Sequence, residues 1–156
     1  MDEVAAVDFI VRAKRSTYAA GGDAATVSEV LVPGSKQLEF AEGDWLYRDI
    51  YTGFRFFAGQ ETVYHRDAPV WTMVYCGGVG GAVAEAETHD VYRFLREALS
   101  RVDPGAPYRG PRSFANSVYE YDNSYQGSPR RFRGREGVHR DGREVYGLDY
   151  CGGALE

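Results

Sequence analysis

The tetrapeptide Tyr-Cys-Gly-Gly occurs twice in this chain of 156 residues, at residues 75–78 and again at residues 150–153. These two copies contain the only cysteines of the sequence. A motif that returns after half the length of a chain is typical of an internal repeat, so we compared the two halves of the sequence before reading any chemistry into the cysteines.

The similarity extends upstream of both tetrapeptides. Residues 40–78 align with residues 114–153 when one residue is inserted, and the shared positions are mainly aromatic, glycine and acidic. The matched pairs are Phe40 and Phe114, Trp45 and Tyr119, Tyr47 and Tyr121, Tyr51 and Tyr125, Gly53 and Gly127, Phe57 and Phe132, Gly59 and Gly134, Glu61 and Glu136, and Val63 and Val138. The pattern predicts one domain, residues 1–156, made of two repeats of about 1–78 and 79–156.

A helical pattern precedes each unit. In the second half, apolar residues at helical spacing predict a helix that Thr88 caps and Pro104-Gly105 stops; they are Val91, Phe94, Leu95, Ala98, Leu99 and Val102. In the first half, a similar stripe runs through Val7, Ile10, Val11 and Lys14 and ends by Gly21-Gly22.

The segments after these helices are rich in Val, Tyr, Phe and Trp and are broken by turn dipeptides, which indicates strands. Asp141-Gly142 predicts a two-residue hairpin loop, Thr52-Gly53 divides the corresponding strands of the first unit, and a weaker strand is expected at residues 27–32. We therefore expect an α+β fold: an internal duplication of a helix plus a three-stranded antiparallel meander, with the two units packed about a pseudo-twofold axis. Whether the units share one sheet or form two stays open.

Strand alternation places the glutamates of the repeat. With Asp141-Gly142 as the loop, one face carries Glu136 and its apolar neighbours, together with Val145, Gly147, Asp149 and Cys151. The other face carries Arg131, Arg133 and Arg135 beside Tyr146 and Tyr150, and arginines in that rhythm belong in water. The same reasoning places Glu61 with Val70, Thr72, Val74 and Cys76. Both glutamates are thus expected to point into the apolar interior.

An inward carboxylate flanked by glycines suggests a cavity with an acid in its wall. Aromatic rings near an acid are typical of sites that hold organic cations. We expect ligand-binding roles for Glu61, Glu136, Tyr47, Tyr121 and Trp71. The competing interpretation is that tyrosine hydroxyls or an internal arginine such as Arg48 satisfy the two acids within the protein.

Three functions are compatible with this reading. The preferred one is a non-enzymatic domain that binds a small molecule, either cationic or aromatic, or senses it as an effector. The first alternative is a hydrolase-like enzyme that uses the paired carboxylates; the second is a structural protein-interaction module, with a homodimer left open. No catalytic residue or cofactor is predicted. A zinc site is not expected either, because His65 and His139 would lie roughly 20 Å from Cys76 and Cys151 along their strands.

Composition limits the partners. The net charge of −5 disfavours nucleic acid despite the basic run of residues 130–135. No stretch reaches the ~20 apolar residues that cross a membrane, and the Met1-Asp2-Glu3 start does not resemble a secretory signal, so a cytoplasmic protein with inert, buried thiols is expected. A disulfide between the cysteines stays open. The glycine-rich residues 77–81 match no phosphate loop and predict a flexible connection.

Several segments resemble an uncharacterised bacterial family, domain of unknown function 5680: FIVRAKRSTYA (9–19), PGSKQLEF (33–40), DWLYRDIYTG (44–53), FAGQETV (57–63) and PYRGP (107–111). Some relatives follow a helix-turn-helix domain, and this resemblance implies an effector-sensing role. The expected architecture is also similar to that of GyrI-like effector-binding domains. No catalytic residue is known for the family, so the resemblance assigns none.

Overall fold

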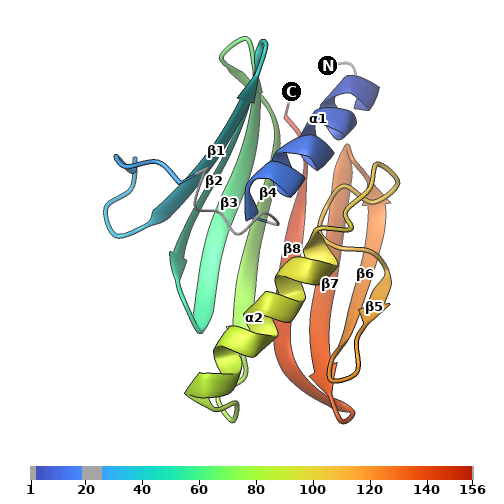
Figure 1. Cartoon of the computed structure of the whole chain (residues 1–156). Helices are drawn as coiled ribbons and strands as arrows, with labels where there is room; N and C mark the ends of the chain where they lie inside the picture. The colour runs from blue at the N-terminus through green and yellow to red at the C-terminus, as the bar shows by residue number, and fades with distance from the viewer. Residues whose placement is uncertain (1–2, 19–25, 156) are drawn as a thin grey trace.

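The computed structural model describes residues 3–18 and 26–155. In chain order its elements are α1 (Glu3–Ser16), β1 (Lys36–Glu42), β2 (Trp45–Gly53), β3 (Phe56–His65), β4 (Ala68–Val79), α2 (Glu85–Leu99), β5 (Ser113–Ala115), β6 (Glu120–Ser128), β7 (Arg131–Arg140) and β8 (Arg143–Ala154). Both helices lie on the same face of one sheet (Figure 1). The sheet has eight strands in the order β1-β2-β3-β4-β8-β7-β6-β5, and every neighbouring pair is antiparallel. The fold is α+β, with one continuous sheet.

Each helix is followed by four strands, so the prediction of a three-stranded meander was wrong. The additional strands are β1 and β5, which lie at the two edges of the sheet. The weaker strand expected at residues 27–32 is also absent: this segment contains bends. The isolated bridge between Thr26 and Leu38 connects its start to β1, and the N–H groups of Val27 and Leu31 donate to the carbonyl and the side-chain oxygen of Gln37. We call α1 to β4 the first half and α2 to β8 the second half.

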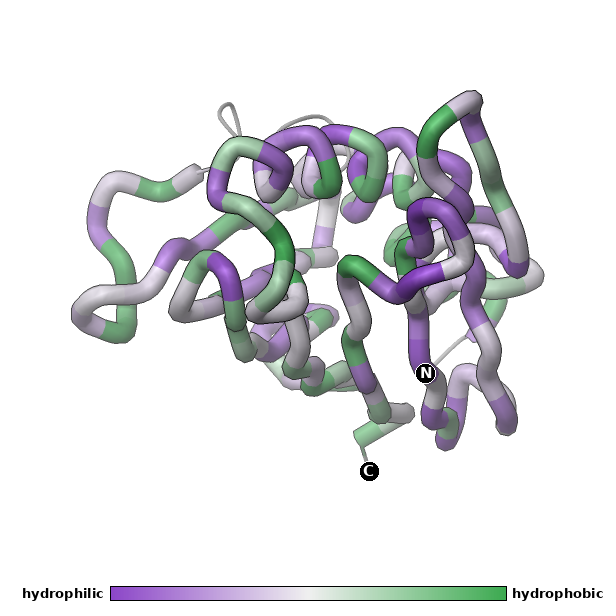
Figure 2. The backbone as a smooth tube through the Cα atoms, turned by 90° about the horizontal axis from the view of Figure 1, so that it is seen from below, coloured by the Kyte–Doolittle hydropathy of each residue, from purple (hydrophilic) through white to green (hydrophobic). Residues whose placement is uncertain are grey.

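The helices form where apolar spacing predicted them, and they bury the predicted stripes. The α1 stripe is buried from Ala6 to Lys14, and the α2 stripe from Thr88 to Leu99. Hydrophobic and hydrophilic residues alternate along both helices in Figure 2, as expected when one side of each packs against the sheet. Thr88 is not the N-cap, because α2 begins one turn earlier, after Ala84. The predicted end of the first helix at Gly21-Gly22 lies outside the described residues.

A β-bulge in each half changes the predicted strand register. Arg140 does pair with Arg143 across the predicted two-residue loop, but the register shifts between Val138 and His139. The matching shift in the first half lies between Val63 and Tyr64. One extra residue moves every later side chain of the partner strand to the other face.

The glutamates therefore keep their predicted face but have different neighbours. Glu136 lies opposite Leu148, and Glu61 lies opposite Met73. Gly147, Asp149 and Cys151 were wrongly placed on the face of Glu136, and Thr72, Val74 and Cys76 on that of Glu61, whereas Val145 is in the buried core and Val70 packs against it. The buried face instead carries Tyr146 and Tyr150, which had been placed in water.

The two halves meet where β4 pairs with β8. Tyr75 lies opposite Tyr150 at the centre of this pairing, and Trp71 and Val79 lie opposite Ala154 and Tyr146 near its ends. Gly77 belongs to β4, and a Cβ atom there would lie 2.2 Å from the carbonyl oxygen of Gly147. Gly77 is therefore required for close strand packing. The prediction of a flexible connection over residues 77–81 was wrong for residues 77–79, because these belong to β4.

The hairpins of the two halves also match in register. Gly59 lies opposite Tyr75, as Gly134 lies opposite Tyr150. A Cβ atom at either glycine would lie 2.4 Å from an atom of the facing tyrosine ring or hydroxyl, because each tyrosine lies across its glycine. The arginine face is confirmed: Arg131, Arg133 and Arg135 are exposed. No helix within residues 3–18 and 26–155 has the length and apolar composition needed to span a bilayer.

The thiols differ from the prediction. Cys76 and Cys151 are free and exposed, because the bulges turn them to the face of the sheet that the helices do not cover. They are not directly opposite each other, since Cys151 pairs with Val74 and Cys76 pairs with Asp149.

Both thiols should therefore react in the native state. We expect Ellman's reagent to modify two cysteines per chain without denaturant, since exposed thiols need no unfolding to be reached. Titration of the reduced protein with and without urea measures this directly. A second thiol that appears only in urea would contradict the assigned face.

Candidate functional site

A cavity of about 210 Å³ is lined by residues of β1 to β4, of both helices and of the connection between α2 and β5. Its lining is rich in aromatic rings: Tyr18, Tyr47, Tyr51, Phe54, Phe57, Tyr75, Tyr92 and Tyr108. Its charged lining residues are Lys14, Lys36, Asp49, Glu61, Arg96 and Arg109. Lys36 and Phe54 are exposed, whereas Tyr47, Asp49 and Glu61 are buried. The exposed residues mark the mouth of the cavity and the buried ones its floor.

Two carboxylates lie side by side on this floor. Asp49 of β2 and Glu61 of β3 are direct cross-strand partners, and they are only 3% and 2% exposed. Tyr75 donates a hydrogen bond of 2.6 Å to Oδ1 of Asp49. Residues directly opposite on antiparallel strands have their Cβ atoms ~5 Å apart, so the two acids repel each other when both are ionised.

One ammonium group contacts this pair. Lys14 Nζ of α1 lies 2.7 Å from Oε2 of Glu61 and also donates to the main-chain carbonyl of Tyr108. Within the described part of the chain, Oε2 of Glu61 accepts no well-directed hydrogen bond, so this contact is an ion pair by proximity. Two acids thus face one contacting cation.

Burial shifts the pKa of two of these groups, Asp49 and Lys14. It is the main cause that raises the pKa of Asp49 to about 7; the charge of Glu61 adds to the effect, and the Tyr75 hydrogen bond, Arg109 and Lys14 oppose it. Burial also lowers the pKa of Lys14, against the attraction of Glu61. When Asp49 ionises, two buried negative charges lie beside the directly contacting ammonium of Lys14, with Arg109 at the wall of the same cavity.

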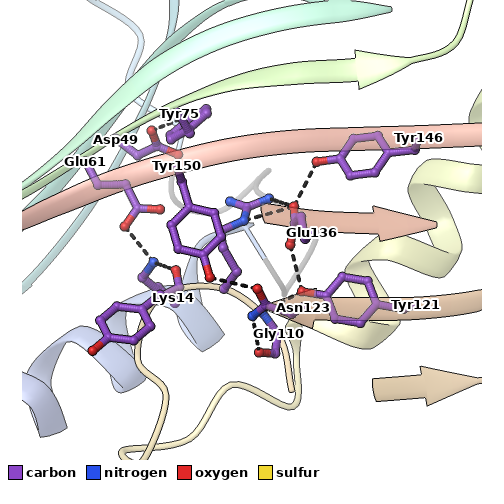
Figure 3. Close-up of polar contacts among 12 residues, drawn as sticks. Lys14, Asp49, Glu61, Tyr75, Gly110, Tyr121, Asn123, Glu136, Tyr146 and Tyr150 are labelled. Atoms are coloured by element: carbon purple, nitrogen blue, oxygen red, sulfur yellow. Dashed lines mark hydrogen bonds and ion pairs between the residues drawn. The ribbon is translucent and has the colours of Figure 1, made fainter. Parts of the chain in front are cut away.

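The matching position in the second half is closed. Glu136 is fully buried, and its Oε1 accepts from Nε of Arg109 at 3.0 Å, from Nη2 of Arg109 at 2.7 Å and from Tyr146 at 2.9 Å. Tyr121 donates to Oε2 at 2.7 Å. These donors converge on Glu136 in Figure 3. A buried carboxylate with a guanidinium and two hydroxyl donors is fully compensated.

An amide replaces the second acid in this half. Asn123 lies opposite Glu136, as Asp49 lies opposite Glu61. Its Oδ1 accepts from Tyr150 at 2.7 Å, and its Nδ2 donates to the carbonyl of Gly110 at 3.0 Å. Asn123 thus carries the same tyrosine hydrogen bond as Asp49 without a charge.

The two halves therefore differ in how they compensate a buried glutamate. Trp71 of the first half lies where the second half has Tyr146, and its indole N–H donates to Pro129 instead. Glu61 thus lacks the hydroxyl donor at that position and faces a carboxylate where Glu136 faces an amide. The second half is electrostatically complete, and the first half, which contains the cavity, is not.

The five predicted site residues divide into two groups. Glu61 and Tyr47 line the cavity. Glu136, Tyr121 and Trp71 are buried in the interior outside the lining, and Trp71 stacks on Phe132 with ring centroids 5.5 Å apart.

The internal arginine that compensates Glu136 is Arg109. The prediction that Arg48 compensates a buried glutamate was wrong. Arg48 instead pairs with Glu39 at 2.6 Å, and both side chains are only partly buried. Arg109 is contributed by the connection between α2 and β5, where no periodicity announces an inward side chain.

The sequence reasoning also missed Asp49. A usable signal was present, because Tyr47, Asp49 and Tyr51 alternate along one strand and must share a face. No metal-binding group of three or more His, Cys, Asp or Glu side chains is found in the described portion of the chain. His65 stacks on Trp45, and His139 lies 3.1 Å from Asp122.

Comparison with known proteins gives a family and no function. No curated protein and no solved structure matches the chain, so the likeness to GyrI-like domains stays a prediction. A family profile described as "Domain of unknown function (DUF5680)" matches residues 49–155. The match covers the greater part of the chain and includes Asp49, Glu61, Arg109 and Glu136. The chain therefore belongs to the DUF5680 family.

Proposed function

We propose that the domain binds a small organic cation in the cavity of the first half, without catalysing a reaction on it. The observation that carries this proposal is the buried pair of Asp49 and Glu61, which one ammonium contacts, in the floor of an aromatic cavity. Unpaired charge is costly in a protein interior, and a bound cation removes that cost. Aromatic walls attract cations through the negative faces of their rings.

The size of the cavity limits the ligand. Its volume of about 210 Å³ is below the range of ~300–1,000 Å³ that is usual for drug-sized ligands. An apolar cavity of ~150 Å³ is enough for benzene. The expected ligand therefore has about one ring and a short charged group.

The predicted site residues take different roles in this proposal. Glu61 and Tyr47 contact the ligand together with Asp49. Glu136 and Tyr121 hold Arg109 at the wall of the cavity, and Trp71 packs beneath the site. The effector-sensing role rests on the family resemblance alone.

We also propose that the domain arose by internal duplication of residues of about 1–78 and 79–156. The support is the agreement of registers: Asp49 opposite Glu61 matches Asn123 opposite Glu136, and Gly59 opposite Tyr75 matches Gly134 opposite Tyr150. In this reading one copy keeps an open site, and the other has closed it with its own side chains.

Cation binding can be tested by thermal shift and calorimetry on the full chain. We expect small organic ammonium and amidinium compounds to raise the melting temperature, and their neutral isosteres to leave it unchanged. Asp49→Asn and Glu61→Gln should each weaken binding at least tenfold, because each removes one of the two negative charges. The control Asp44→Asn changes an exposed acid and should bind as the wild type does. Equal binding of cationic and neutral compounds would contradict the proposal.

One observation favours a second candidate, hydrolase-like acid–base catalysis. A carboxyl with a pKa of about 7 beside a second carboxylate is the arrangement that lets one act as acid and the other as base. The structure moves this alternative from Glu61 and Glu136 to Asp49 and Glu61, because Glu136 is bound by Arg109. Turnover with a bell-shaped pH profile that Asp49→Asn abolishes would replace binding by catalysis as the conclusion.

A further inference from the structure

The connection between α2 and β5 contributes two side chains, Tyr108 and Arg109, that pack in the second half and also line the cavity. Arg109 binds Glu136 through two nitrogens. The neighbouring Tyr108 ring stacks on Phe132 at 4.1 Å, meets Tyr125 edge-on at 5.1 Å and lies 6.5 Å from Tyr150. We call Tyr108 and Arg109 the internal occupant. It consists of an aromatic ring packed among three other rings and, on the next residue, a cation that binds the buried Glu136.

The first half has three corresponding rings in the same registers, namely those of Tyr51, Phe57 and Tyr75. Tyr51, Gly59 and Tyr75 lie opposite one another across β2, β3 and β4, as Tyr125, Gly134 and Tyr150 do across β6, β7 and β8. Phe57 lies opposite Gly53 and Gly77, and Phe132 lies opposite Gly127 and Gly152. We call Tyr51, Phe57 and Tyr75 the aromatic cluster. All three line the cavity.

The first half has no counterpart of Tyr108 and Arg109. When Phe40 and Phe114 are aligned, Pro33 matches Pro107, and Gly34-Ser35 stands where the second half has Tyr108-Arg109. Glycine has no side chain, and the hydroxyl of Ser35 donates to the carbonyl of Val32. Neither residue lines the cavity. Residues 34 and 35 thus place no ring and no cation against the aromatic cluster and the acids, and the Arg109 guanidinium lies 5.6 Å from the Tyr75 ring centroid at the wall of the same cavity.

Resting on the proposed function, we infer that the ligand is an aryl cation: a single aromatic ring against the aromatic cluster, joined to an amidinium, guanidinium or ammonium group that faces Asp49 and Glu61. Such a ligand reproduces the chemistry that Tyr108 and Arg109 supply in the second half. The rings of the cluster pack edge-on against one another, with Phe57 6.3 Å from Tyr51 and 6.0 Å from Tyr75, so the ligand ring would lie on their cavity side. Offset-stacked and edge-on contacts with these rings favour an aromatic ligand there.

The remaining lining favours a single positive charge. Four cationic residues of the described chain line the cavity: Lys14 and Arg109 are paired with Glu61 and Glu136, whereas Lys36 and Arg96 remain, and Lys36 is exposed at the mouth. Their charges repel a second cationic group on the part of the ligand that reaches the mouth. Monocationic compounds are therefore preferred to dications of the same length.

Three probes separate the contributions of ring and charge. Benzamidine carries both, benzamide carries the ring without the charge, and acetamidine carries the charge without the ring. By calorimetry at pH 8 on the full chain, we expect benzamidine to bind at least tenfold more tightly than either of the others. Asp49→Asn should weaken benzamidine and acetamidine alike, because it removes charge.

The aromatic cluster is tested by Phe57→Leu, which should weaken benzamidine severalfold and leave acetamidine unchanged. Phe56→Leu is the matched control, because Phe56 is the adjacent residue and is 67% exposed. Far-ultraviolet circular dichroism verifies that each variant folds, and Tyr51→Leu replaces Phe57→Leu if the latter does not.

The outcomes distinguish the proposal of cation binding from the inference that the cation carries an aryl ring. Acetamidine bound as tightly as benzamidine would overturn the aryl-cation inference and leave cation binding in place. Benzamide bound as tightly as benzamidine would overturn both, because charge would then contribute nothing. No binding of any probe at millimolar concentration would also overturn both.

Discussion

Replacement of Glu136 by alanine will lower the free energy of unfolding by about 3–5 kcal/mol, the largest stability effect that we expect from any charged residue in this domain. The substitution leaves the guanidinium of Arg109 buried without its counter-ion, and the hydroxyls of Tyr121 and Tyr146 without their acceptor. Urea unfolding followed by tryptophan fluorescence gives the difference in free energy.

Two further variants show that the effect comes from burial. Asp44→Ala removes an ion pair with Arg66 in which both side chains are largely exposed, and it should cost at most about 1 kcal/mol. The double variant Arg109→Met/Glu136→Leu removes both buried charges and should recover much of the lost stability. If Glu136→Ala and Asp44→Ala cost the same, the buried network does not have the role described here.

Replacement of Asp49 by asparagine will stabilise the domain at pH 8, by on the order of 2 kcal/mol, and will have little effect near pH 4. The pKa of Asp49 is raised from 3.8 to about 7 in the folded protein. Between these values the unfolded chain has lost a proton that the folded domain keeps, so this group makes stability fall as pH rises from about 4 to about 7. Asparagine does not titrate, and it can still accept the hydrogen bond from Tyr75, as Asn123 does from Tyr150.

The reverse exchange provides the control. Asn123→Asp puts a second acid opposite Glu136 and should destabilise the domain more at pH 8 than at pH 4. Urea titrations at both pH values, each compared with the wild type, measure both effects; the pKa of Lys14, which burial lowers and the charge of Asp49 raises, changes together with Asp49→Asn. A variant Asp49→Asn that is less stable than the wild type at pH 8 would show that the carboxylate is needed for the fold.

Local sequence was enough to place the two glutamates. Glu61 and Glu136 each share every second strand position with apolar residues and glycine. Strand periodicity therefore places both glutamates on the buried face. The helices were predictable for a similar reason, because the stripes at Val7 to Lys14 and Val91 to Leu99 have helical spacing. Both predictions depend on residues within a few positions of one another.

The predictions that failed involve features that local sequence does not encode: a single bulge residue in a strand, or a contact between residues far apart in the chain. A bulge beside Val63 or Val138 leaves no clear mark in the sequence, yet it turned Cys76, Cys151, Tyr146 and Tyr150 to the faces opposite to those predicted. Arg109 reaches Glu136 from an irregular connection, 27 residues away along the chain. Such contacts are fixed by tertiary packing, which periodicity does not encode.

The pairing of β4 with β8 sets the folding kinetics of the domain. Every other neighbouring pair of strands is joined by a single short turn, so those ladders close small loops. At this one pairing, Tyr75 must find Tyr150 at the far end of the chain. The entropy of closing that long loop and the high contact order of this step make it the slowest assembly event, and refolding rates should respond most to substitutions along these two strands.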